Sequence, residues 1–207
     1  MVFFFVKTIE NICIRHYIFI MKILYINSCV RDQSRTSQLG EYLLSKLDGD
    51  VEQIVLQSER LKPLDGNSLD KRNNLLSKGL LSDDMFKYAN QFASADVIVI
   101  SAPFWDLAFP ALLKIYLEQI TVCGITFKYS DMGVPQGLCK AKQLYYITTA
   151  GGPVFCDFGY SYVKSLATTF FGIDNTKCFL AQNLDVVGVD VQKQIEMSKE
   201  DIDKNFD

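Results

Sequence analysis

The amino-acid sequence predicts an α/β fold in which helices cover both faces of a doubly wound, five-stranded parallel sheet. Short apolar runs alternate with helical patterns along most of the chain, and this order of elements is typical of such a sheet. The run Val97–Ile100 is continuously aliphatic, which favours a strand buried on both faces. No repeat or Pro/Ser-rich linker interrupts the pattern, so we expect one domain with the strand order 2-1-3-4-5.

The first three elements form one β-α-β unit. Lys22–Asn27 is predicted to be a buried strand, and Val51–Leu56 a second strand. Leucines at helical spacing predict a helix over Thr36–Leu47 between them. Two parallel strands joined in this way make a right-handed crossover.

The remaining elements continue the alternation. Pro110 is favourable in the first turn of a helix and marks where one begins. In chain order we expect a polar stretch of loops or short helices at Gln57–Ser82, a helix at Asp83–Ser94, a strand at Ala95–Ser101, a helix at Pro110–Thr121, a short extended segment at Thr126–Tyr129, a strand at Gln143–Thr148, a helix from about Tyr160 to Phe171, a strand at Thr176–Ala181 and a helix at Val191–Lys204.

Composition and charge exclude several classes of function. The 207 residues, 49% of them hydrophobic, suit one globular domain. A net charge of −3 and scattered Lys and Arg argue against nucleic acid as a partner. The six cysteines include no Cys-x-x-Cys pair, and His16 is the only histidine, so the sequence predicts neither a zinc site nor a Ser-His-Asp hydrolase. Scattered thiols of this kind are typical of the reducing cytoplasm, where we expect the protein to be.

The first twenty residues do not fit the domain pattern. Apolar runs at their two ends are separated by Lys7, Glu10 and Arg15, so neither reaches the length of a membrane-spanning helix, and we expect no stable membrane insertion. The segment also lacks the order of a secretory signal. We therefore expect residues 1–20 to be a non-native or disordered extension, with translation beginning at Met21. An amphipathic helix on a membrane surface is the alternative.

Three short loops carry the best clue to function. They are Ser28–Thr36, Ala102–Leu107 and Thr148–Pro153, and each follows a predicted strand and precedes a helical pattern. Such loops gather at one edge of an open parallel sheet, so we expect a single ligand site there. The first loop lacks both the Gly-x-Gly-x-x-Gly pattern of dinucleotide binders and the Gly-Lys-Ser/Thr of nucleotide triphosphatases.

The first loop carries hydroxyls where those motifs carry glycines. Ser28, Ser34 and Thr36 can donate to phosphate oxygens, the N–H groups of the helix start point the same way, and Arg31 or Arg35 can offset the charge. This set suits a terminal monophosphate. The alternative is that Ser34 or Thr36 only caps the helix.

The other two loops suit the body of a flat ligand. Phe104 and Trp105 follow the aliphatic strand, where an aromatic ring can lie on the backbone, and Asp106 is the ionisable residue there. These rings can instead simply close the end of the sheet. Gly151 and Gly152 allow close backbone approach and expose N–H groups, although a double glycine is also a common turn.

From Met21 onward the chain resembles the FMN-dependent NADH-azoreductases, also described as FMN-dependent NADH:quinone oxidoreductases, within the flavodoxin-like fold. Four stretches in this order and spacing carry the resemblance. The first is Ser28 with Ser34–Leu39, and the second is Val97–Pro103, which leads into an aromatic tetrapeptide and then Leu113–Tyr116. The third is Gly124–Tyr129, and the fourth is Ile147–Gly152. The resemblance implies that residues 21–207 form a flavodoxin-like FMN-binding domain.

The resemblance implies a set of residues that hold FMN. Ser28, Ser34, Arg35 and Thr36 would bind the phosphate, Phe104, Trp105, Asp106 and Leu107 would lie along the isoalloxazine, and Thr149, Ala150, Gly151 and Gly152 would meet the polar edge of the ring. It also implies a homodimer with two flavin sites at the subunit interface. The family often has Tyr-Asn in place of Trp105-Asp106 and Ser-Arg in place of Thr149-Ala150, and these departures affect the redox potential.

The predicted activity is a two-step (ping-pong) exchange in which NADH or NADPH gives two electrons to the flavin through N5 and a quinone or azo compound then takes them. No catalytic side chain is needed, because the flavin carries the chemistry. Phe155, Phe158 and Tyr160 are candidates to line the substrate side, or else to pack in the core or at a dimer contact. Two alternatives stay open: a flavodoxin-type FMN electron carrier without a dedicated NADH site, and a flavin-free binding module.

Overall fold

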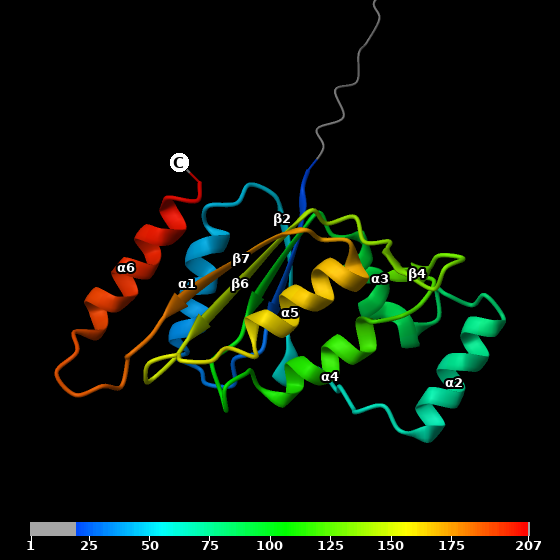
Figure 1. Ribbon diagram of the computed structural model, residues 1–207, viewed down its shortest axis with the longest axis horizontal. Coiled ribbons are helices and arrows are strands. Elements are labelled where there is room, and N and C mark those ends of the chain that lie inside the picture. Colours follow the sequence, from blue (N-terminus) through cyan, green and yellow to red (C-terminus); the bar gives the residue numbers. More distant parts are fainter. Residues whose placement is uncertain (1–19, 207) are drawn as a thin grey trace, which may run out of the picture.

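The computed structural model describes residues 20–206 and confirms the predicted fold class. Its main sheet has five strands, all parallel, in the order β2-β1-β3-β6-β7 (Figure 1). This order corresponds to the predicted 2-1-3-4-5. The strands are β1 (Lys22–Asn27), β2 (Asp50–Val55), β3 (Val97–Ser101), β6 (Gln143–Thr149) and β7 (Asn175–Ala181).

Helices cover both faces of this sheet. The α-helices are α1 (Arg35–Leu44), α2 (Gly66–Ser77), α3 (Lys87–Ser94), α4 (Ala111–Ile120), α5 (Tyr160–Leu166) and α6 (Val191–Asp203). Side chains of α1 and α6 pack on one face, and side chains of α3, α4 and α5 pack on the other. The predicted helices and strands of the main sheet are therefore present, with bounds that differ by up to four residues. The largest difference is at the helix predicted from Asp83, where a 3-10 turn at Asp84–Phe86 precedes α3.

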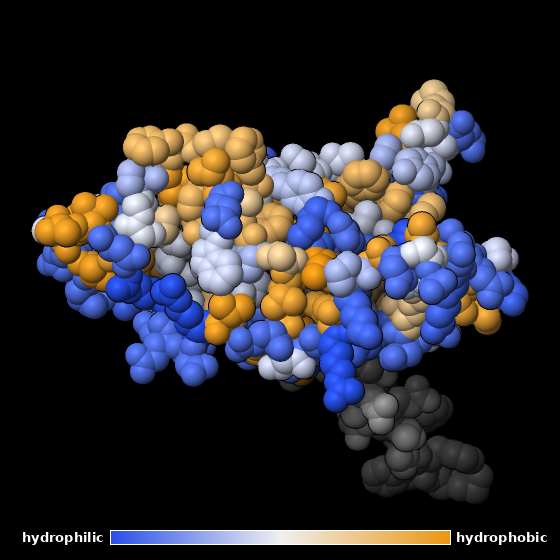
Figure 2. All heavy atoms as spheres, turned by 90° about the horizontal axis from the view of Figure 1, so that it is seen from below, coloured by the Kyte–Doolittle hydropathy of each residue, from blue (hydrophilic) through white to orange (hydrophobic). Residues whose placement is uncertain are grey.

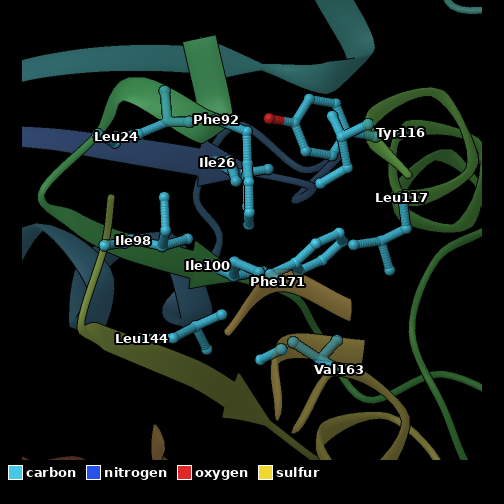
Figure 3. Packing of buried hydrophobic residues seen from close by; sticks show 14 of the residues in the cluster. Leu24, Ile26, Phe92, Ile98, Ile100, Tyr116, Leu117, Leu144, Val163 and Phe171 are labelled. Carbon is cyan, nitrogen blue, oxygen red and sulfur yellow. The ribbon is translucent and has the colours of Figure 1, made fainter. Parts of the chain in front are cut away.

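The alternation of side chains along β1 builds both halves of the core. Leu24 and Ile26 point into the cluster under α3, α4 and α5, which Figure 3 shows around Phe92, while Ile23 and Tyr25 point into the cluster under α1 and α6. All four side chains are at most 1% exposed. A strand with apolar residues on both faces can only lie in the interior of the sheet, where β1 lies between β2 and β3.

Helix α1 lies close to the sheet because it carries a glycine at the contact. A Cβ added to Gly40 would lie 2.1 Å from Ser101 Oγ and 2.7 Å from Tyr25 Oη. The Tyr25 hydroxyl itself donates to Ser101 Oγ at 3.1 Å. The glycine therefore lets the middle of α1 approach the end of β3, and this approach helps to bring the loops before α1 and after β3 together.

The structure differs from the sequence prediction in three segments. The stretch Gln57–Ser82, predicted as loops or short helices, contains one helix of twelve residues, α2, which begins with a capping box between Asp65 and Ser68. A two-stranded antiparallel hairpin pairs β4 (Phe127–Tyr129) with β5 (Pro135–Gly137), of which only the first strand was expected. The predicted helix Tyr160–Phe171 is α-helical to Leu166 and continues as a π-helical turn at Ala167–Phe171.

Two predictions concern the membrane and the N-terminus. Within residues 20–206, no helix has the length and the apolar composition to span a membrane. The expectation that residues 1–20 are an extension, with translation starting at Met21, falls almost entirely outside the described residues and stays a prediction.

Candidate functional site

The three predicted loops meet at the carboxyl edge of the sheet and enclose a cleft of about 340 Å³. The loop that follows β7 closes the fourth side. The side chains and backbone that line the cleft come from Val30, Arg31, Gln33, Ser34, Arg35, Thr36, Pro103, Phe104, Trp105, Thr149, Ala150, Gly151, Leu184 and Asp185.

The first loop is held in place by the residue at the end of β1. Asn27 Oδ1 accepts from the backbone N–H of Cys29 at 2.9 Å, and Asn27 Nδ2 donates to Ser37 Oγ at 2.8 Å. Ser34 then caps α1, since its Oγ accepts from the backbone N–H of Ser37 at 3.3 Å. The N–H groups of Arg35 and Thr36, in the first turn, have no partner within the helix and stand at the positive end of its dipole. This end of α1 faces the cleft and favours an anion.

Two residues of the first loop lie behind the cleft. Ser28 is 1% exposed, and its hydroxyl donates to the carbonyl oxygen of Ser101 at 3.0 Å. Cys29 is buried beside the same carbonyl, and burial raises the pKa of its thiol above the usual value. The thiol is therefore protonated at neutral pH, which argues against a nucleophilic cysteine at this site.

The second loop extends β3 toward the cleft and ends in a tight turn. The N–H groups of Ala102 and Phe104 donate to the carbonyl oxygens of Ile147 and Thr149, at 2.9 and 3.0 Å, so the loop stays attached to β6. Trp105 and Ala108 then exchange two backbone hydrogen bonds across a two-residue turn. Both central residues, Asp106 and Leu107, have positive φ angles, of 50° and 66°.

This turn places strain next to the cleft. Positive φ at both central positions is the geometry of a type I′ turn, which favours Asn or Asp followed by Gly. Asp106 suits its position, whereas a leucine at φ 66° is unusual. The Leu107 carbonyl oxygen accepts from the N–H of Phe158 at 2.9 Å, and this contact ties the turn to the loop after β6. Strained backbone of this kind often occurs at functional sites.

The third loop is locked to the loop after β7. The N–H groups of Leu184 and Asp185 donate to the carbonyl oxygens of Ala150 and Gly151, at 3.2 and 2.9 Å. A Cβ added to Gly151 would lie 2.4 Å from Asp185 Oδ2, so the glycine makes room for that carboxylate. Asp185 is thereby held at the rim of the cleft.

Side-chain contacts join the loops across the cleft and set its charge. The hydroxyls of Thr36 and Thr149 are 2.6 Å apart and share a hydrogen bond. Arg35 Nη1 forms an ion pair with Asp185 Oδ1 at 3.0 Å and also donates to the carbonyl oxygen of Leu184 at 3.3 Å. Arg31 has no ion pair within the described part of the chain. The cleft therefore carries one positive charge in excess, beside the helix N-terminus.

The structure brings together eight of the twelve predicted site residues: Ser34, Arg35, Thr36, Phe104, Trp105, Thr149, Ala150 and Gly151. Four others lie near the cleft without lining it, namely Ser28, Asp106, Leu107 and Gly152. Sequence reasoning missed Leu184 and Asp185. A signal for them existed, because they follow the last predicted strand and so belong at the same edge of a parallel sheet.

The chain is similar to known proteins over most of its length. A family model described as a flavodoxin-like fold matches residues 21–206. The FMN-dependent NADH:quinone oxidoreductase of Coprothermobacter proteolyticus is 35% identical over 190 residues, which cover 84% of this chain and 92% of that protein. The chain belongs to this oxidoreductase family. A Clostridium perfringens protein of the same name is 34% identical over 185 residues, again with 84% and 92% coverage.

The fold is also found in solved structures. An azoreductase from Bacillus anthracis str. Sterne superposes with a TM-score of 0.77 at 25% identity, covering 90% of this chain and 99% of that one. Membership of the FMN-dependent NADH:quinone oxidoreductase family confirms the resemblance that the sequence motifs predict. Three of those motifs supply lining residues of the cleft, while Gly124–Tyr129 leads into the β4–β5 hairpin and does not line it.

Proposed function

We propose that this protein is an FMN-dependent oxidoreductase that passes two electrons from NADH or NADPH to quinones and azo compounds. The relatives that share most of its length are FMN-dependent NADH:quinone oxidoreductases, and the similar solved structure is an azoreductase. The observation that carries the proposal is the cleft itself. It joins a helix N-terminus and arginines at one end to an aromatic, backbone-rich wall at the other.

The cleft residues fit FMN. The N–H groups of Arg35 and Thr36 and the guanidinium of Arg31 would bind the phosphate dianion, because a helix N-terminus and a guanidinium both stabilise negative charge. Phe104 and Trp105 would lie along the flat ring system. The backbone of Ala150 and Gly151, which both line the cleft, would meet its polar edge.

When bound, FMN supplies the redox chemistry, accepting two electrons from the nicotinamide nucleotide and giving them to the acceptor. The chain's own residues bind and orient it. The hydrogen bond between Thr36 and Thr149 fixes the phosphate end of the cleft relative to the ring end. We propose a ping-pong order, in which the nicotinamide nucleotide leaves before the acceptor enters the same space. No side chain then has to act as a general acid or base.

Binding of FMN tests the phosphate assignment. Arg31→Gln should weaken FMN binding by about tenfold, because a charge-assisted hydrogen bond is lost, and should leave the binding of riboflavin, which has no phosphate, unchanged. Arg60→Gln, at an exposed arginine outside the cleft, is the matched control and should change neither. Titration followed by flavin fluorescence measures both affinities. An unchanged ratio of FMN to riboflavin affinity in Arg31→Gln would overturn the assignment.

The proposal includes a homodimer with two flavin sites at the subunit interface and a location in the cytoplasm.

Exposed apolar side chains beside the cleft form a surface that a partner or a substrate can contact. Phe155 is 92% exposed and Phe158 is 59% exposed in the loop after β6, and Figure 2, viewed toward the carboxyl edge, shows apolar side chains gathered on this face. We propose that Phe155 and Phe158 border the space that the acceptor enters.

A further inference from the structure

A second hollow, of about 660 Å³, lies against α2 and shares no lining residue with the cleft. Figure 1 shows α2 at the opposite end of the molecule from α6. Four segments line the hollow, namely the stretch between β2 and α2, one face of α2, the turn that leads into α3, and α4. The volume is within the range of small-molecule sites.

The segments around this hollow are fixed to one another. On α2, Leu75 is 7% exposed and belongs to the same buried cluster as Phe86, which precedes α3. On α4, Gln119 Nε2 donates to the carbonyl oxygen of Lys62 at 2.9 Å and so holds the stretch before α2. The hollow is therefore enclosed by elements that contact one another directly.

The charges that line the hollow favour an anionic ligand. Five basic and four acidic side chains line it. Three of the acidic residues already accept hydrogen bonds from neighbouring groups, namely Glu59, Asp65 and Asp83. Among the residues that the structure describes, Lys87 is the one basic lining residue with an ion pair, to Glu59 Oε2 at 3.8 Å. An anion thus meets basic groups that are free to pair, whereas a cation meets carboxylates that already have partners.

Arg72 on α2 is the basic residue best placed to hold such an anion. It is partly buried, whereas the other basic residues that line the hollow are exposed. Its Nε is shielded from solvent and has no hydrogen-bond partner within residues 20–206. A buried donor without a partner is costly, more so on a charged group. A carboxylate can accept from Nε and from one Nη of the same guanidinium, because its two oxygens match two parallel N–H groups.

The remaining lining suits an aromatic body with a polar group at its far end. Leu64, Met85 and Tyr88 are each partly buried and line the hollow. An aromatic ring can stack on Tyr88 and contact the sulfur of Met85. Gln119 donates through Nε2 to the backbone, and its Oε1 has no partner within the described part of the chain. This oxygen can accept a hydrogen bond from a hydroxyl or an amino group.

We propose that this hollow binds an aromatic carboxylic acid that carries a hydroxyl or amino group away from its carboxylate. Arg72 pairs with the carboxylate, Met85 and Tyr88 contact the ring, and Gln119 accepts from the hydroxyl or amino group. The site goes beyond the proposed function and does not depend on it, because no residue of the hollow lines the cleft.

The test is isothermal titration calorimetry with 6-hydroxy-2-naphthoate, which has a carboxylate and a hydroxyl at opposite ends of two fused rings. The FMN-loaded protein should bind one molecule per chain with a dissociation constant below about 1 mM. The flavin-free protein should give the same affinity, so the test stands even if the proposed function fails. Binding of 2-naphthol, which lacks the carboxylate, and of inorganic phosphate, which lacks the ring, should each be at least about tenfold weaker.

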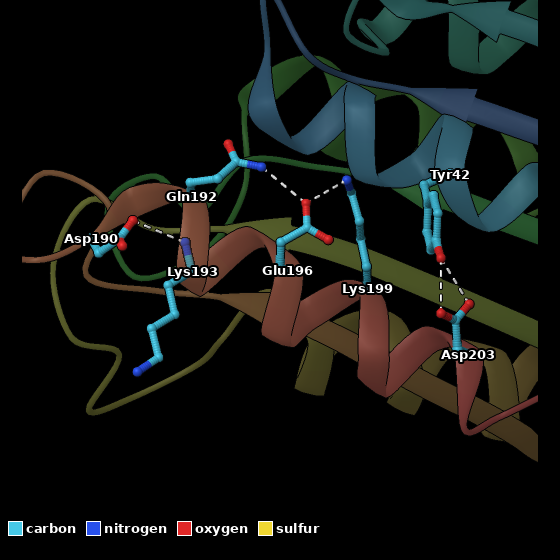
Figure 4. A network of polar contacts seen from close by, with 7 residues as sticks. All are labelled: Tyr42, Asp190, Gln192, Lys193, Glu196, Lys199 and Asp203. Carbon is cyan, nitrogen blue, oxygen red and sulfur yellow. Dashed lines mark hydrogen bonds and ion pairs between the residues drawn. The ribbon is translucent and has the colours of Figure 1, made fainter.

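Variants of the chain locate the site. Arg72→Gln should weaken binding of 6-hydroxy-2-naphthoate by at least about tenfold, and Arg72→Lys should weaken it less, because lysine keeps the charge but not the parallel N–H groups. Gln119→Leu should weaken binding of 6-hydroxy-2-naphthoate but not of 2-naphthoate, which lacks the hydroxyl. Lys193→Gln is the matched control and should change neither, since Lys193 is exposed on α6 and Figure 4 shows its side chain extending away from α1.

The outcomes decide the assignment. Loss of affinity in Arg72→Gln, with the control unchanged, supports it. No binding to the wild-type protein overturns it, and so does binding that Arg72→Gln leaves unchanged, because the acid then lies elsewhere. Equal losses in Arg72→Gln and Lys193→Gln overturn it as well, since they indicate general attraction to the charge of the protein. Phosphate that binds as tightly as the naphthoate overturns the aromatic assignment.

Discussion

Leu107 has the least favourable backbone conformation among the residues around the cleft. Its φ of 66° lies in the left-handed region, where the Cβ of a leucine crowds the backbone, and its side chain is 51% exposed and contributes little packing. The turn persists because its ends are fixed, by the backbone hydrogen bonds between Trp105 and Ala108 and by the contact between Leu107 and Phe158. The turn places Trp105 at the cleft wall.

Leu107→Gly should therefore stabilise the flavin-free protein or leave it unchanged, with a gain of up to about 1 kcal/mol in the free energy of unfolding. Leu69→Gly is the control. Leu69 is also exposed, at 42%, but lies inside α2, where glycine costs about 1 kcal/mol. Urea unfolding measures both variants. Equal destabilisation by the two substitutions would show that the Leu107 side chain matters more than the backbone strain.

At the scale of elements, α1 forms part of the cleft wall and is fixed both to the sheet and to α6. Gly40 brings α1 close to β3, and Asp203 joins α6 to α1 through Tyr42 and Lys46. The hydrogen bond from Lys46, together with that from Tyr42, holds the pKa of the Asp203 carboxyl below its usual value. A carboxyl whose pKa is lowered in the folded state stabilises the protein above its unfolded pKa of about 3.9, and this contribution is lost as the pH falls through the folded pKa.

Asp203→Asn should thus lower the melting temperature at pH 6 and have a smaller effect at pH 3, where the wild-type carboxylate is itself becoming protonated. The effect should be small, because the pair is partly exposed. Circular dichroism melts across this pH range measure it. A difference between the two proteins that stays constant from pH 6 to pH 3 would mean that ionisation of Asp203 does not stabilise the fold.

Much of this architecture could be predicted from the sequence, because short apolar runs and helical leucine spacing are local signals. Helix α2 could not, since it is polar along most of its length and buries only Leu75. The contact between Arg35 and Asp185 joins residues 150 positions apart, and nothing local to either predicts it. The loop after β7 has no hydroxyl residue, no aromatic residue and no double glycine, which are the features that drew attention to the other three loops. Burial of Ser28 could not be predicted either, because the sequence around a serine that follows a strand does not indicate whether its side chain faces the core or the solvent.

For the whole molecule, an exposed apolar surface on the β4–β5 hairpin supports the proposed homodimer. The β4–β5 hairpin carries Tyr129, Met132, Val134 and Leu138, and Met132 is 88% exposed. Apolar side chains in a group of this kind mark interaction surfaces. We expect sedimentation equilibrium to give the mass of two chains.

Replacing Met132 and Val134 together by serine should raise the dissociation constant of this dimer by at least about tenfold, because apolar contact area is lost. Val187→Ser, at a fully exposed valine in the loop after β7, is the control and should have no effect. A wild-type protein that sediments as one chain would rule out the dimer, and an unchanged constant in the double variant would rule out the hairpin as its interface.

The central claim is that bound flavin passes electrons from NADH to a quinone. The most direct measurement mixes the FMN-loaded protein with NADH without oxygen, follows the flavin absorbance by stopped flow, and then adds a quinone. We predict rapid bleaching by NADH and recovery of the absorbance on addition of the quinone. A bound flavin that NADH does not bleach would contradict the account and would indicate an electron carrier instead.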